Sequence, residues 1–466
     1  MKKINNVTWK IEKKKPMKVP VMIFASEKLL NNIKQDKTLE QAQNMATLKG
    51  VEKNIVVCPD AHQGYGACIG GVAAFNLNDG IVSPGMTGYD INCGIRLLTS
   101  NLKKQDIEKN KKEIIDLMFK KIPSGVGKGG IIKLSKQDLK EVLETGANWA
   151  VKNNYGTKQD LERTEDNGCI KGANSKDVSE RAIKRGLPQL GSLGAGNHFL
   201  EIQQVEEIYD KKIANTFGIK EKGQVTMMIH CGSRGLGHQV CSDYIKLMEE
   251  RYGFKHLPDR ELINAPIDSE LGKKYLSAMA AAANFGFTNR HLIMHWVRES
   301  FKKIIKNSKL EMVYDVAHNI IKFEEYNNQT LCIHRKGATR AFGPGRKELP
   351  EIYKKTGQPI IIPGSMGTSS YILVGTKKAE EVSFSSTAHG AGRVMSRHEA
   401  LRRFRGERTK SELAQKGIEV KSGSWKSLAE EAPGVYKDID EVVKTSHEAG
   451  IGNLVARVTP IGVIKG

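Results

Sequence analysis

Residues 311–319 read EMVYDVAHN, an apolar run that predicts a buried strand and ends in a histidine followed by an asparagine. Three upstream stretches have a similar character: GYDINCG at 88–94, GAGNHFLE at 194–201 and IHCGSRGLGH at 229–238. All four place metal-binding side chains in turns or at strand ends rather than along helices. We therefore expect a divalent metal site built from the side chains that they contribute, which are Asp90, Cys93, His198, His230 and His318.

The donor atoms of this site are chemically mixed. Three imidazoles and a thiolate are borderline-soft ligands, so ligand softness alone favours zinc, and manganese lies at the weak end of the affinity series. Asp90 adds a hard oxygen and allows a second ion that shares the Cys93 thiolate. A two-metal site is typical of phosphoryl or nucleotidyl transfer, in which cations neutralise the charge that develops on phosphate oxygens.

A second group of motifs suits phosphate binding. TAHGAGR at 387–393 places His389 in a glycine-rich turn. A neutral imidazole there is an exposed nucleophile, and Arg393 would hold a phosphate against it. A sixth metal ligand and a hydrogen-bonding turn residue are the alternatives. AFGPGR at 341–346 and PGSMGTSSY at 363–371 are turns whose successive backbone N–H groups form anion-binding nests. The chain has neither the P-loop motif nor a Rossmann glycine fingerprint.

The charge balance is strongly basic. Lys and Arg number 73 against 52 Asp and Glu, a formal net charge of +21, which predicts attraction to RNA or DNA. A lysine-rich proteome is the simpler explanation for the evenly spread lysines. The arginines instead gather near the glycine-rich motifs, and HRKGATR at 334–340 is either a solvated turn or a contact to a nucleic-acid backbone. The candidate phosphate contacts are Arg234, Arg335, Lys336, Arg340 and Arg393.

Strand and helix patterns alternate irregularly, without a steady βαβ rhythm, so we expect an α+β fold with mixed sheets. The predicted strands are 54–58, 69–75, 95–98, 225–231, 311–316, 330–334, 359–363 and 371–375. Residues 101–121 predict an amphipathic surface helix, and 270–307 predict one long helix or two packed helices. Residues 152–190 are polar and rich in turn formers, which predicts a surface excursion. Because ligands from 90 to 318 must meet, we expect one large domain over 1–466.

The compartment follows from cysteine usage and from the chain start. The seven cysteines include no CxxC pair, which favours a reducing environment. The basic N-terminus has no apolar segment after it, and no stretch approaches the ~18 apolar residues of a membrane span. A cytoplasmic location is therefore expected, with no membrane partner.

The motifs, in this order, resemble those of the RtcB family of RNA-splicing ligases. The matching stretches are PDAHQGYGACIGG (59–71), SPGMTGYDINCGIRLL (83–98), LGAGNHFLEIQ (193–203), IHCGSRGLGHQV (229–240), VYDVAHN (313–319), HRKGATRAFGPGR (334–346), IIPGSMGTSSYILVG (361–375), HGAGRVMSR (389–397), EAPGVYKDIDEVV (431–443) and the terminal VIKG. The resemblance runs from about residue 50 to the end, and it covers residues 1–50 and 152–190 only weakly. It implies a single large domain with mixed sheets flanked by helices around a central metal cleft.

The resemblance also implies an activity. A GTP- and manganese-dependent RNA ligase would join a 2′,3′-cyclic phosphate or 3′-phosphate end to a 5′-hydroxyl end. Manganese then replaces zinc, with two ions per active site bridged by Cys93. His389 would form a covalent histidine–GMP, and the guanylyl group would pass to the RNA 3′-phosphate before the 5′-hydroxyl displaces GMP. Water would first open a cyclic phosphate.

The family likeness assigns a guanylate pocket, with the penultimate Lys465 facing the base. Its members would be Asn197, Glu201, Asn319, Pro363, Gly364, Ser365, Met366, Ser370, Gly390, Ala391, Gly392, Tyr436 and Lys465. The implied partners are RNA, with tRNA halves as one candidate, and an archease-type activator protein as a further candidate.

Two other functions compete with this expectation. A metal-dependent phosphoesterase would use the same ions but would need no histidine nucleophile and no guanine pocket. A basic RNA-binding or chaperone-like protein would hold its metal in a closed structural site with four ligands. Five candidate ligands beside anion nests argue against a closed site.

Overall fold

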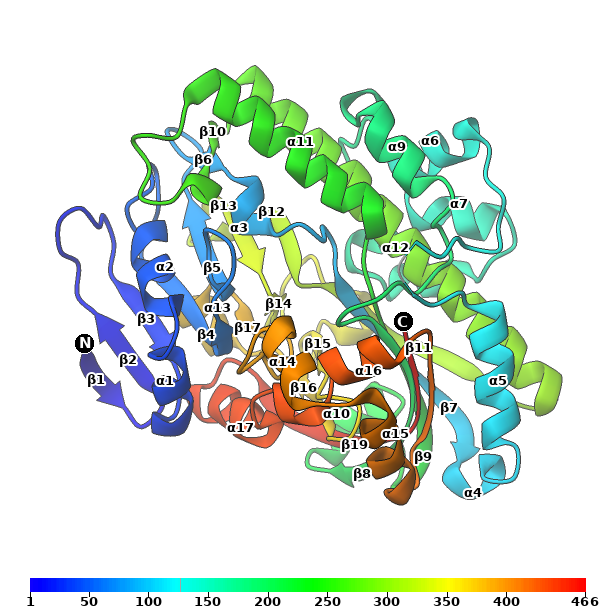
Figure 1. Cartoon of the computed structure of the whole chain (residues 1–466). Helices are drawn as coiled ribbons and strands as arrows, with labels where there is room; N and C mark the ends of the chain where they lie inside the picture. The colour runs from blue at the N-terminus through cyan, green and yellow to red at the C-terminus, as the bar shows by residue number, and fades with distance from the viewer. Residues whose placement is uncertain (126) are drawn as a thin grey trace.

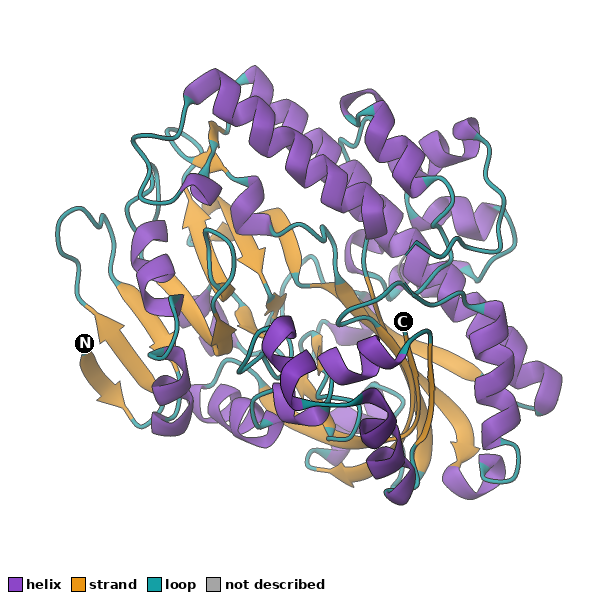
Figure 2. Ribbon diagram, in the orientation of Figure 1, coloured by secondary structure: helices purple, strands orange, loops and turns teal. Residues whose placement is uncertain are grey.

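Two large β-sheets meet near the middle of the molecule, and helices pack around them (Figures 1 and 2). The computed structural model describes residues 1–125 and 127–466. The mixture of helices and sheets confirms the predicted α+β class, and the large apolar cluster of the first sheet extends into the long central helix.

The first sheet has the strand order β1-β2-β3-β4-β5-β13-β12. Only β3 and β4 run parallel among these neighbours in the described chain; the other pairs are antiparallel. Its strands are β1 (Lys2–Asn5), β2 (Thr8–Ile11), β3 (Val21–Phe24), β4 (Ile55–His62), β5 (Ile69–Phe75), β13 (Gln329–Lys336) and β12 (Asn319–Tyr326).

The second sheet has the order β11-β7-β9-β8-β19-β16-β15, and β18 adds to β19 in parallel. Its strands are β11 (Leu310–Ala317), β7 (Gly94–Lys103), β9 (Gln224–Cys231), β8 (Phe199–Ile208), β19 (Asn453–Lys465), β16 (Ser370–Val374), β15 (Pro359–Ile362) and β18 (Glu419–Ser422). Two short pairs complete the strands: β6 (Ile81–Val82) with β10 (Ala265–Pro266), and β14 (Ala338–Arg340) with β17 (Ser386–Ala388).

One helix, α12 (Glu270–Ile304), runs unbroken through the molecule, which is the first of the two arrangements expected from the proline-free sequence. Ser269 caps its N-terminus by accepting a hydrogen bond from the backbone N–H of Gly272, and alanines 278 and 280–283 are buried. In the described residues, no helix has both the length and the apolar character that a membrane crossing requires. The remaining helices are α1 (Glu27–Ile33), α2 (Thr38–Met45), α3 (Pro84–Thr87), α4 (Lys104–Ile107), α5 (Lys111–Lys121), α6 (Lys136–Thr145), α7 (Ala147–Lys152), α8 (Lys158–Glu162), α9 (Glu180–Gly186), α10 (Lys211–Thr216), α11 (Arg234–Tyr252), α13 (Lys377–Ser383), α14 (Arg397–Arg403), α15 (Gly406–Gln415), α16 (Trp425–Glu430) and α17 (Ile439–Ala449).

Two sequence-based expectations differ from the structure. Residues 101–121 are not one helix, because β7 continues to Lys103, which pairs with Gln224 of β9, before α4 and α5 begin. Residues 152–190 are more than a surface excursion. Glu165, in a short 3-10 helix, is 1% exposed and accepts a hydrogen bond from the backbone N–H of Ala317. Some polar side chains of residues 152–190 therefore form contacts inside the protein rather than with solvent.

A buried ion triad joins α12 to the second sheet. Asp315 of β11 accepts hydrogen bonds from Arg290 of α12 at 2.7 and 2.9 Å and from Arg96 of β7 at 2.7 Å. All three side chains are 0% exposed. Arg290 also donates to the backbone carbonyls of Asn92 and Cys231, both at 2.7 Å. The triad therefore fixes a helix, three strands and the turn before β7 around one carboxylate.

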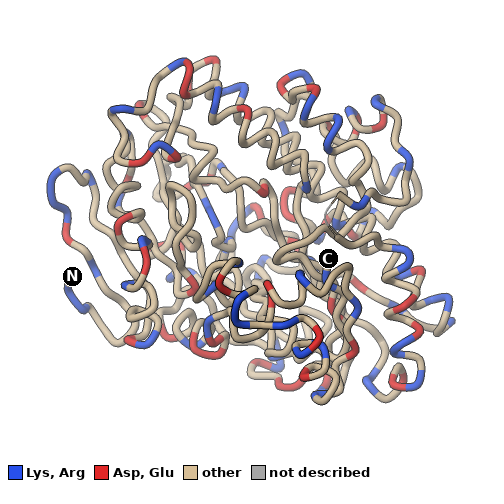
Figure 3. The backbone as a smooth tube through the Cα atoms, viewed as in Figure 1, with Lys and Arg blue, Asp and Glu red and all other residues tan. Residues whose placement is uncertain are grey.

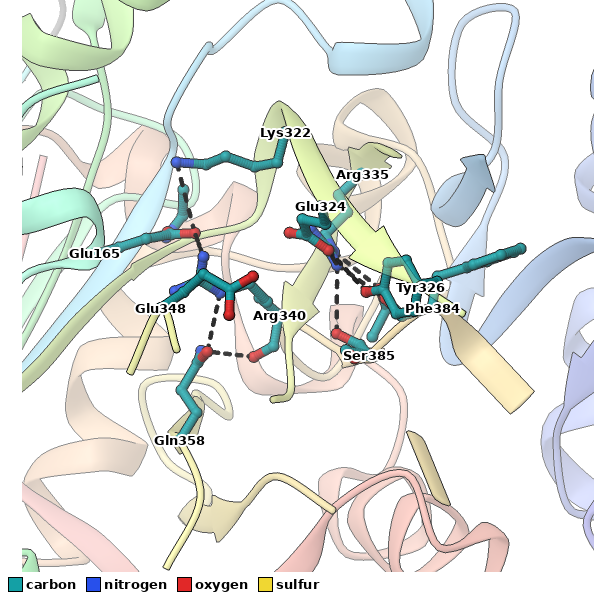
Figure 4. A network of polar contacts seen from close by, with 12 residues as sticks. Glu165, Lys322, Glu324, Tyr326, Arg335, Arg340, Glu348, Gln358, Phe384 and Ser385 are labelled. Carbon is teal, nitrogen blue, oxygen red and sulfur yellow. Dashed lines mark hydrogen bonds and ion pairs between the residues drawn. The ribbon is translucent and has the colours of Figure 1, made fainter. Parts of the chain in front are cut away.

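A second buried network lies at the end of the first sheet (Figure 4). Arg335 donates two hydrogen bonds to Glu324, at 2.7 and 2.8 Å. Arg340 lies 3.3 Å from Glu165 and donates to Gln358. A buried charge without a partner strongly destabilises a fold, so Glu324 and Glu165 are needed to keep Arg335 and Arg340 buried.

We predict that Asp315→Asn lowers the free energy of unfolding by about 3–5 kcal/mol, because two buried guanidinium groups lose their countercharge. Denaturant unfolding followed by circular dichroism measures the change. Asp438→Asn is the matched control, since Asp438 pairs with Lys28 at the surface with 46% of its side chain exposed and its loss is expected to change stability by less than about 1 kcal/mol. Equal losses in the two variants would contradict the role given to the triad.

Candidate active site

Strand register brings the predicted metal ligands together. In the second sheet, Gly94 pairs with Cys231 and with Ala317, and Phe199 pairs with His230. Cys93, His198 and His318 each lie one residue beyond a paired strand end. Together with His230 of β9, they therefore lie at the same end of the adjacent strands β11, β7, β9 and β8. His318 is also the single residue between β11 and β12, where the chain passes from the second sheet to the first.

The ligand atoms form two groups that share one thiol. Cys93 Sγ lies 3.2 Å from His230 Nε2, which lies 3.4 Å from His318 Nε2. On the other side, Cys93 Sγ lies 3.5 Å from His198 Nε2, which lies 2.8 Å from Asp90 Oδ2. In each group of three the ligand atoms lie within 4.8 Å of one another. All five predicted ligands thus converge, and the arrangement has room for two ions with Cys93 between them.

The donor chemistry of this cluster fits bound cations. Burial lowers the pKa of His230 and of His318 well below the ordinary value, which leaves both imidazoles neutral with lone pairs available. Burial also raises the pKa of the Cys93 thiol to about 11, an effect that Asp90 reinforces. Asp90 Oδ1 has no hydrogen-bond partner in the described residues. Buried groups are normally paired, so converging neutral nitrogens and an unpaired carboxylate oxygen indicate a cation site.

His389 lies beside this cluster, with its ring centre 4.8 Å from that of His318. It follows β17, and its Nδ1 lies 2.6 Å from Oδ2 of Asp60 on β4. The backbone N–H groups of His389 and Gly390 also donate to this carboxylate, at 3.0 and 3.2 Å. A carboxylate at Nδ1 favours the proton there and leaves the lone pair on Nε2. Nε2 is therefore the ring nitrogen of His389 whose lone pair is available to a ligand.

Asp60 is suited to this orienting role because it stays ionised. Its side chain is 0% exposed. Burial alone would raise the pKa of the Asp60 carboxyl, but His389 outweighs this effect and holds the pKa below the ordinary value. Sequence reasoning missed this residue, although it quoted the motif PDAHQG that contains it.

One pocket holds most of the residues predicted to bind guanylate. Of that set, only Asn319 and Ser370 do not line the pocket in the described structure. Ser370 Oγ instead accepts a hydrogen bond from the backbone N–H of Gly364 in the lining turn. Asn319 donates a hydrogen bond to the backbone carbonyl of Asp90 and accepts one from the N–H of Gly337, so it stabilises the turn that carries Asp90. His389 lines the same pocket, which places the candidate nucleophile inside the candidate nucleotide site.

Buried carboxylates give this pocket its polarity. Glu431 lies 3.6 Å from Lys465 Nζ and 3.1 Å from Arg393. Burial tends to raise the pKa of Glu431, but Lys465 and then Arg393 outweigh it and hold the pKa below its ordinary value. Glu201, by contrast, is buried with weaker compensation, and burial raises its pKa to about 8. One carboxylate stays charged and the other is poised to be neutral near pH 7, so the pocket offers both acceptors and donors.

A second pocket adjoins the first at Asn197 and Arg397, reaches the ligand cluster and is basic. It is lined by Asp90 and His198 of the cluster and by Arg185, Arg234, Arg397 and Lys426. Arg234 has a φ of 56°, a conformation that non-glycine residues rarely adopt. It is 8% exposed, its Nε donates to Ser192, and its Nη2 has no partner in the described residues. Such an unpaired buried guanidinium group suits an anion that lies against the metal cluster.

Three of the predicted RNA contacts are wrong. Arg335 and Arg340 are 0% and 3% exposed and are held by Glu324 and Glu165. Lys336 is 6% exposed, and its ammonium group donates to the backbone carbonyls of Tyr65, Ala67 and Gly85. Their charges stabilise the fold and do not face a ligand. Arg234 and Arg393 do line pockets, so their contact with RNA stays a prediction.

Comparison with known proteins places this site in a family. A family model described as tRNA-splicing ligase RtcB matches residues 41–466. The tRNA-splicing ligase RtcB of Thermococcus kodakarensis is 51% identical over 478 aligned positions, which cover 100% of this chain and 99% of that protein. Those of Archaeoglobus fulgidus and Nanoarchaeum equitans are each 52% identical, with the same coverage. The chain therefore belongs to the RtcB family.

Proposed function

We propose that this enzyme joins a 3′-phosphate or 2′,3′-cyclic phosphate RNA end to a 5′-hydroxyl end, with GTP as a substrate and manganese as its metal. Family membership and the names of its relatives support RNA ligation, with tRNA halves as the candidate substrate. One observation carries the finer proposal: His389, held at Nδ1 by Asp60, lies between a cluster with a shared thiol and an enclosed pocket.

The residues present fit two manganese ions. One would be held by Cys93, His230 and His318, and the other by Asp90, Cys93 and His198. Bound there, manganese would neutralise the negative charge that develops on phosphate oxygens during transfer. The soft donors that favour zinc are accompanied by the hard oxygen of Asp90, and the proposal of manganese rests on the family resemblance alone.

In the first step, Nε2 of His389 attacks the α-phosphate of GTP. A phosphorus–nitrogen bond forms, the bond to the β-phosphate breaks, and pyrophosphate leaves. Asp60 holds the proton on Nδ1 and stabilises the positive charge that the ring gains. Lys465 and Glu201 would select guanine, because Lys465 donates to the acceptor O6 where adenine carries a donor amine.

In the later steps the guanylyl group passes to the RNA. An RNA 3′-phosphate oxygen attacks the guanylyl phosphorus, and His389 Nε2 leaves. The 5′-hydroxyl of the second RNA then attacks the activated 3′-phosphate and releases GMP. A terminal phosphate in the second pocket would lie between Arg234 and the cluster, next to the nucleotide pocket, which shares Asn197 and Arg397 with it.

Covalent labelling tests this proposal. With manganese and GTP labelled at the α-phosphate, the wild-type chain should retain an acid-labile label, ATP should give little label, and His389→Ala should give none. His256→Ala, at an exposed histidine, serves as the control. Label that persists in His389→Ala would overturn the nucleophile assignment. No label alongside rapid cyclic-phosphate hydrolysis would favour the phosphoesterase.

Asp60→Asn should slow the labelling by on the order of 10²–10⁴-fold with little change in GTP affinity, because the amide keeps the shape but loses the charge. Single-turnover labelling over a range of GTP concentrations separates the rate from the affinity. Asp268→Asn, at an exposed site, should label like the wild type. A full rate in Asp60→Asn would remove Asp60 from the proposal.

The shared thiol predicts an unequal effect of two ligand substitutions on metal content. Equilibrium dialysis should find two manganese ions in the wild type, one in His198→Ala, and none in Cys93→Ala, because only Cys93 belongs to both groups. Cys169→Ala, at a half-exposed cysteine outside the cluster, should keep both ions. Two ions in Cys93→Ala would show that the thiol does not bridge.

A further inference from the structure

The segment from α14 to the start of α16 forms an exposed cationic surface beside the second pocket. Figure 1 shows α14, α15 and α16 next to one another near the C-terminus. Figure 3 shows blue Lys and Arg positions along this segment. We call it the cationic surface and define it by Arg402, Arg403, Arg405, Arg408, Lys410, Lys416, Trp425 and Lys426.

Helix stability accounts for only some of these charges. Arg402 and Arg403 lie in the last turn of α14, where positive charge is favourable, but the cations at the start of α15 are not explained in this way. Arg405 is the N-cap of α15 without a side-chain capping bond, and Arg408 lies in the first turn of that helix. Positive charge at a helix N-terminus opposes the helix dipole and is unfavourable by a few tenths of a kcal/mol or more. Arg408 does pair with Glu412, but with the cation on the N-terminal side, which is the weaker order. An external anion would offset this cost.

Four of the seven cations lack a carboxylate partner, whereas Arg403, Arg408 and Lys426 pair with Glu399, Glu412 and Glu430. Within the described chain, no carboxylate lies within 4.0 Å of Arg402, Arg405, Lys410 or Lys416. This contrasts with Arg335 and Arg340, whose charges are consumed inside the protein. The cationic surface therefore retains unneutralised charge.

An exposed aromatic ring lies within this charge. Trp425, the first residue of α16, is 51% exposed, although tryptophan is usually well buried. Lys410 Nζ lies 5.6 Å from the centre of its ring, and Gly406 packs against its backbone, so the position of the residue is fixed from α15. A positioned ring among cations is the combination that binds single-stranded nucleic acid, by base stacking and phosphate pairing.

The surface continues into the second pocket. Arg397 at the start of α14 and Lys426, Ser427 and Glu430 of α16 line that pocket, together with His198 of the metal cluster. The buried, unpaired Nη2 of Arg234 belongs to the same pocket. A chain whose terminal phosphate reached Arg234 would leave the pocket over α16.

We propose that the cationic surface binds the single-stranded RNA that adjoins the reacting end, with a base stacked on Trp425 and phosphates paired with Arg402 and Arg405. The proposal rests on the proposed function, which puts an RNA terminal phosphate in the second pocket. The cationic surface would contact phosphates and the flat face of a base, which all nucleotides have, so binding here would tolerate different RNA sequences.

Direct binding tests the proposal without GTP or manganese, so the outcome does not depend on guanylylation at His389. Fluorescence anisotropy is measured with a labelled single-stranded RNA of about twelve nucleotides that carries a 3′-phosphate. Trp425→Ala should raise the Kd by about 10-fold, and Trp425→Phe, which can still stack, should stay within about 3-fold of wild type. Phe323→Ala, at a phenylalanine that is 48% exposed on β12, is the matched control and should bind like wild type.

A second variant tests the charges by salt dependence. Arg402→Gln with Arg405→Gln should reduce the slope of log K against log salt by about 1.4, since each phosphate contact on a single strand contributes about 0.7. Lys302→Gln with Lys303→Gln, exposed at the end of α12, should leave the slope unchanged. This arm stands even if Trp425→Ala is destabilised, which thermal unfolding would reveal.

Duplex RNA of the same length distinguishes stacking from charge alone. Its bases are already stacked, so Trp425→Ala should leave duplex affinity unchanged while it weakens single-strand binding. Equal losses on both probes would overturn the stacking contact. Wild-type affinity for the single strand in both variants would overturn the RNA proposal and assign the surface to an acidic protein partner.

Discussion

The carboxylate of Asp315 is the point on which this structure depends. It neutralises Arg290 of the central helix and Arg96 of β7, and all three side chains are buried from solvent. The Nη1 group of Arg290 donates to the backbone carbonyls of Asn92 and Cys231, which adjoin Cys93 and His230. A buried charge cannot shift without losing several strong hydrogen bonds, so the backbone on both sides of the metal cluster is held in one position. Fold stability and ligand placement thus share one interaction.

The junction of the two sheets explains why the chemistry lies where it does. The second sheet supplies the ligands from adjacent strand ends, whereas Asp60, which orients His389, comes from β4 of the first sheet. His318 connects the sheets and touches His389. One pocket opens toward the turns after β15 and β17, and the other opens toward α11 and α16. The two pockets adjoin at Asn197 and Arg397, and both reach the ligand cluster, the first at His230 and the second at Asp90 and His198.

Much of this site could be predicted from the sequence because its signals are local. A histidine or cysteine among glycines at a strand end is recognisable without knowing the fold, and the structure brings all five predicted ligands together. Asp60 could not be recognised in this way, because it lies in a buried strand and meets His389 across 329 residues. Arg335 and Arg340 misled for the opposite reason. Their motif looks basic, but the carboxylates that neutralise them, Glu324 and Glu165, lie elsewhere in the chain.

The fold followed the same division. Strands with strong apolar runs and the alanine-rich helix were predicted, whereas β12 and β19 were not. β12 alternates with polar residues along a partly exposed face, and β19 is largely buried but contains Pro460 and Gly462, which are unfavourable inside a strand. The polar stretch 152–190 looked solvent-exposed because composition does not reveal an internal partner. Asp160 in that stretch pairs with Arg298 of α12, and Glu165 pairs with Arg340.

In the proposed reaction, Nε2 of His389 transfers a guanylyl group beside two ions that share Cys93. A crystal structure of the chain grown with manganese and GTP would report on both features at once. We expect density continuous from Nε2 to the nucleotide phosphorus, guanine next to Lys465, and two anomalous peaks on either side of Cys93 Sγ. Nucleotide bonded to another residue, or a single ion that leaves Cys93 unligated, would contradict it.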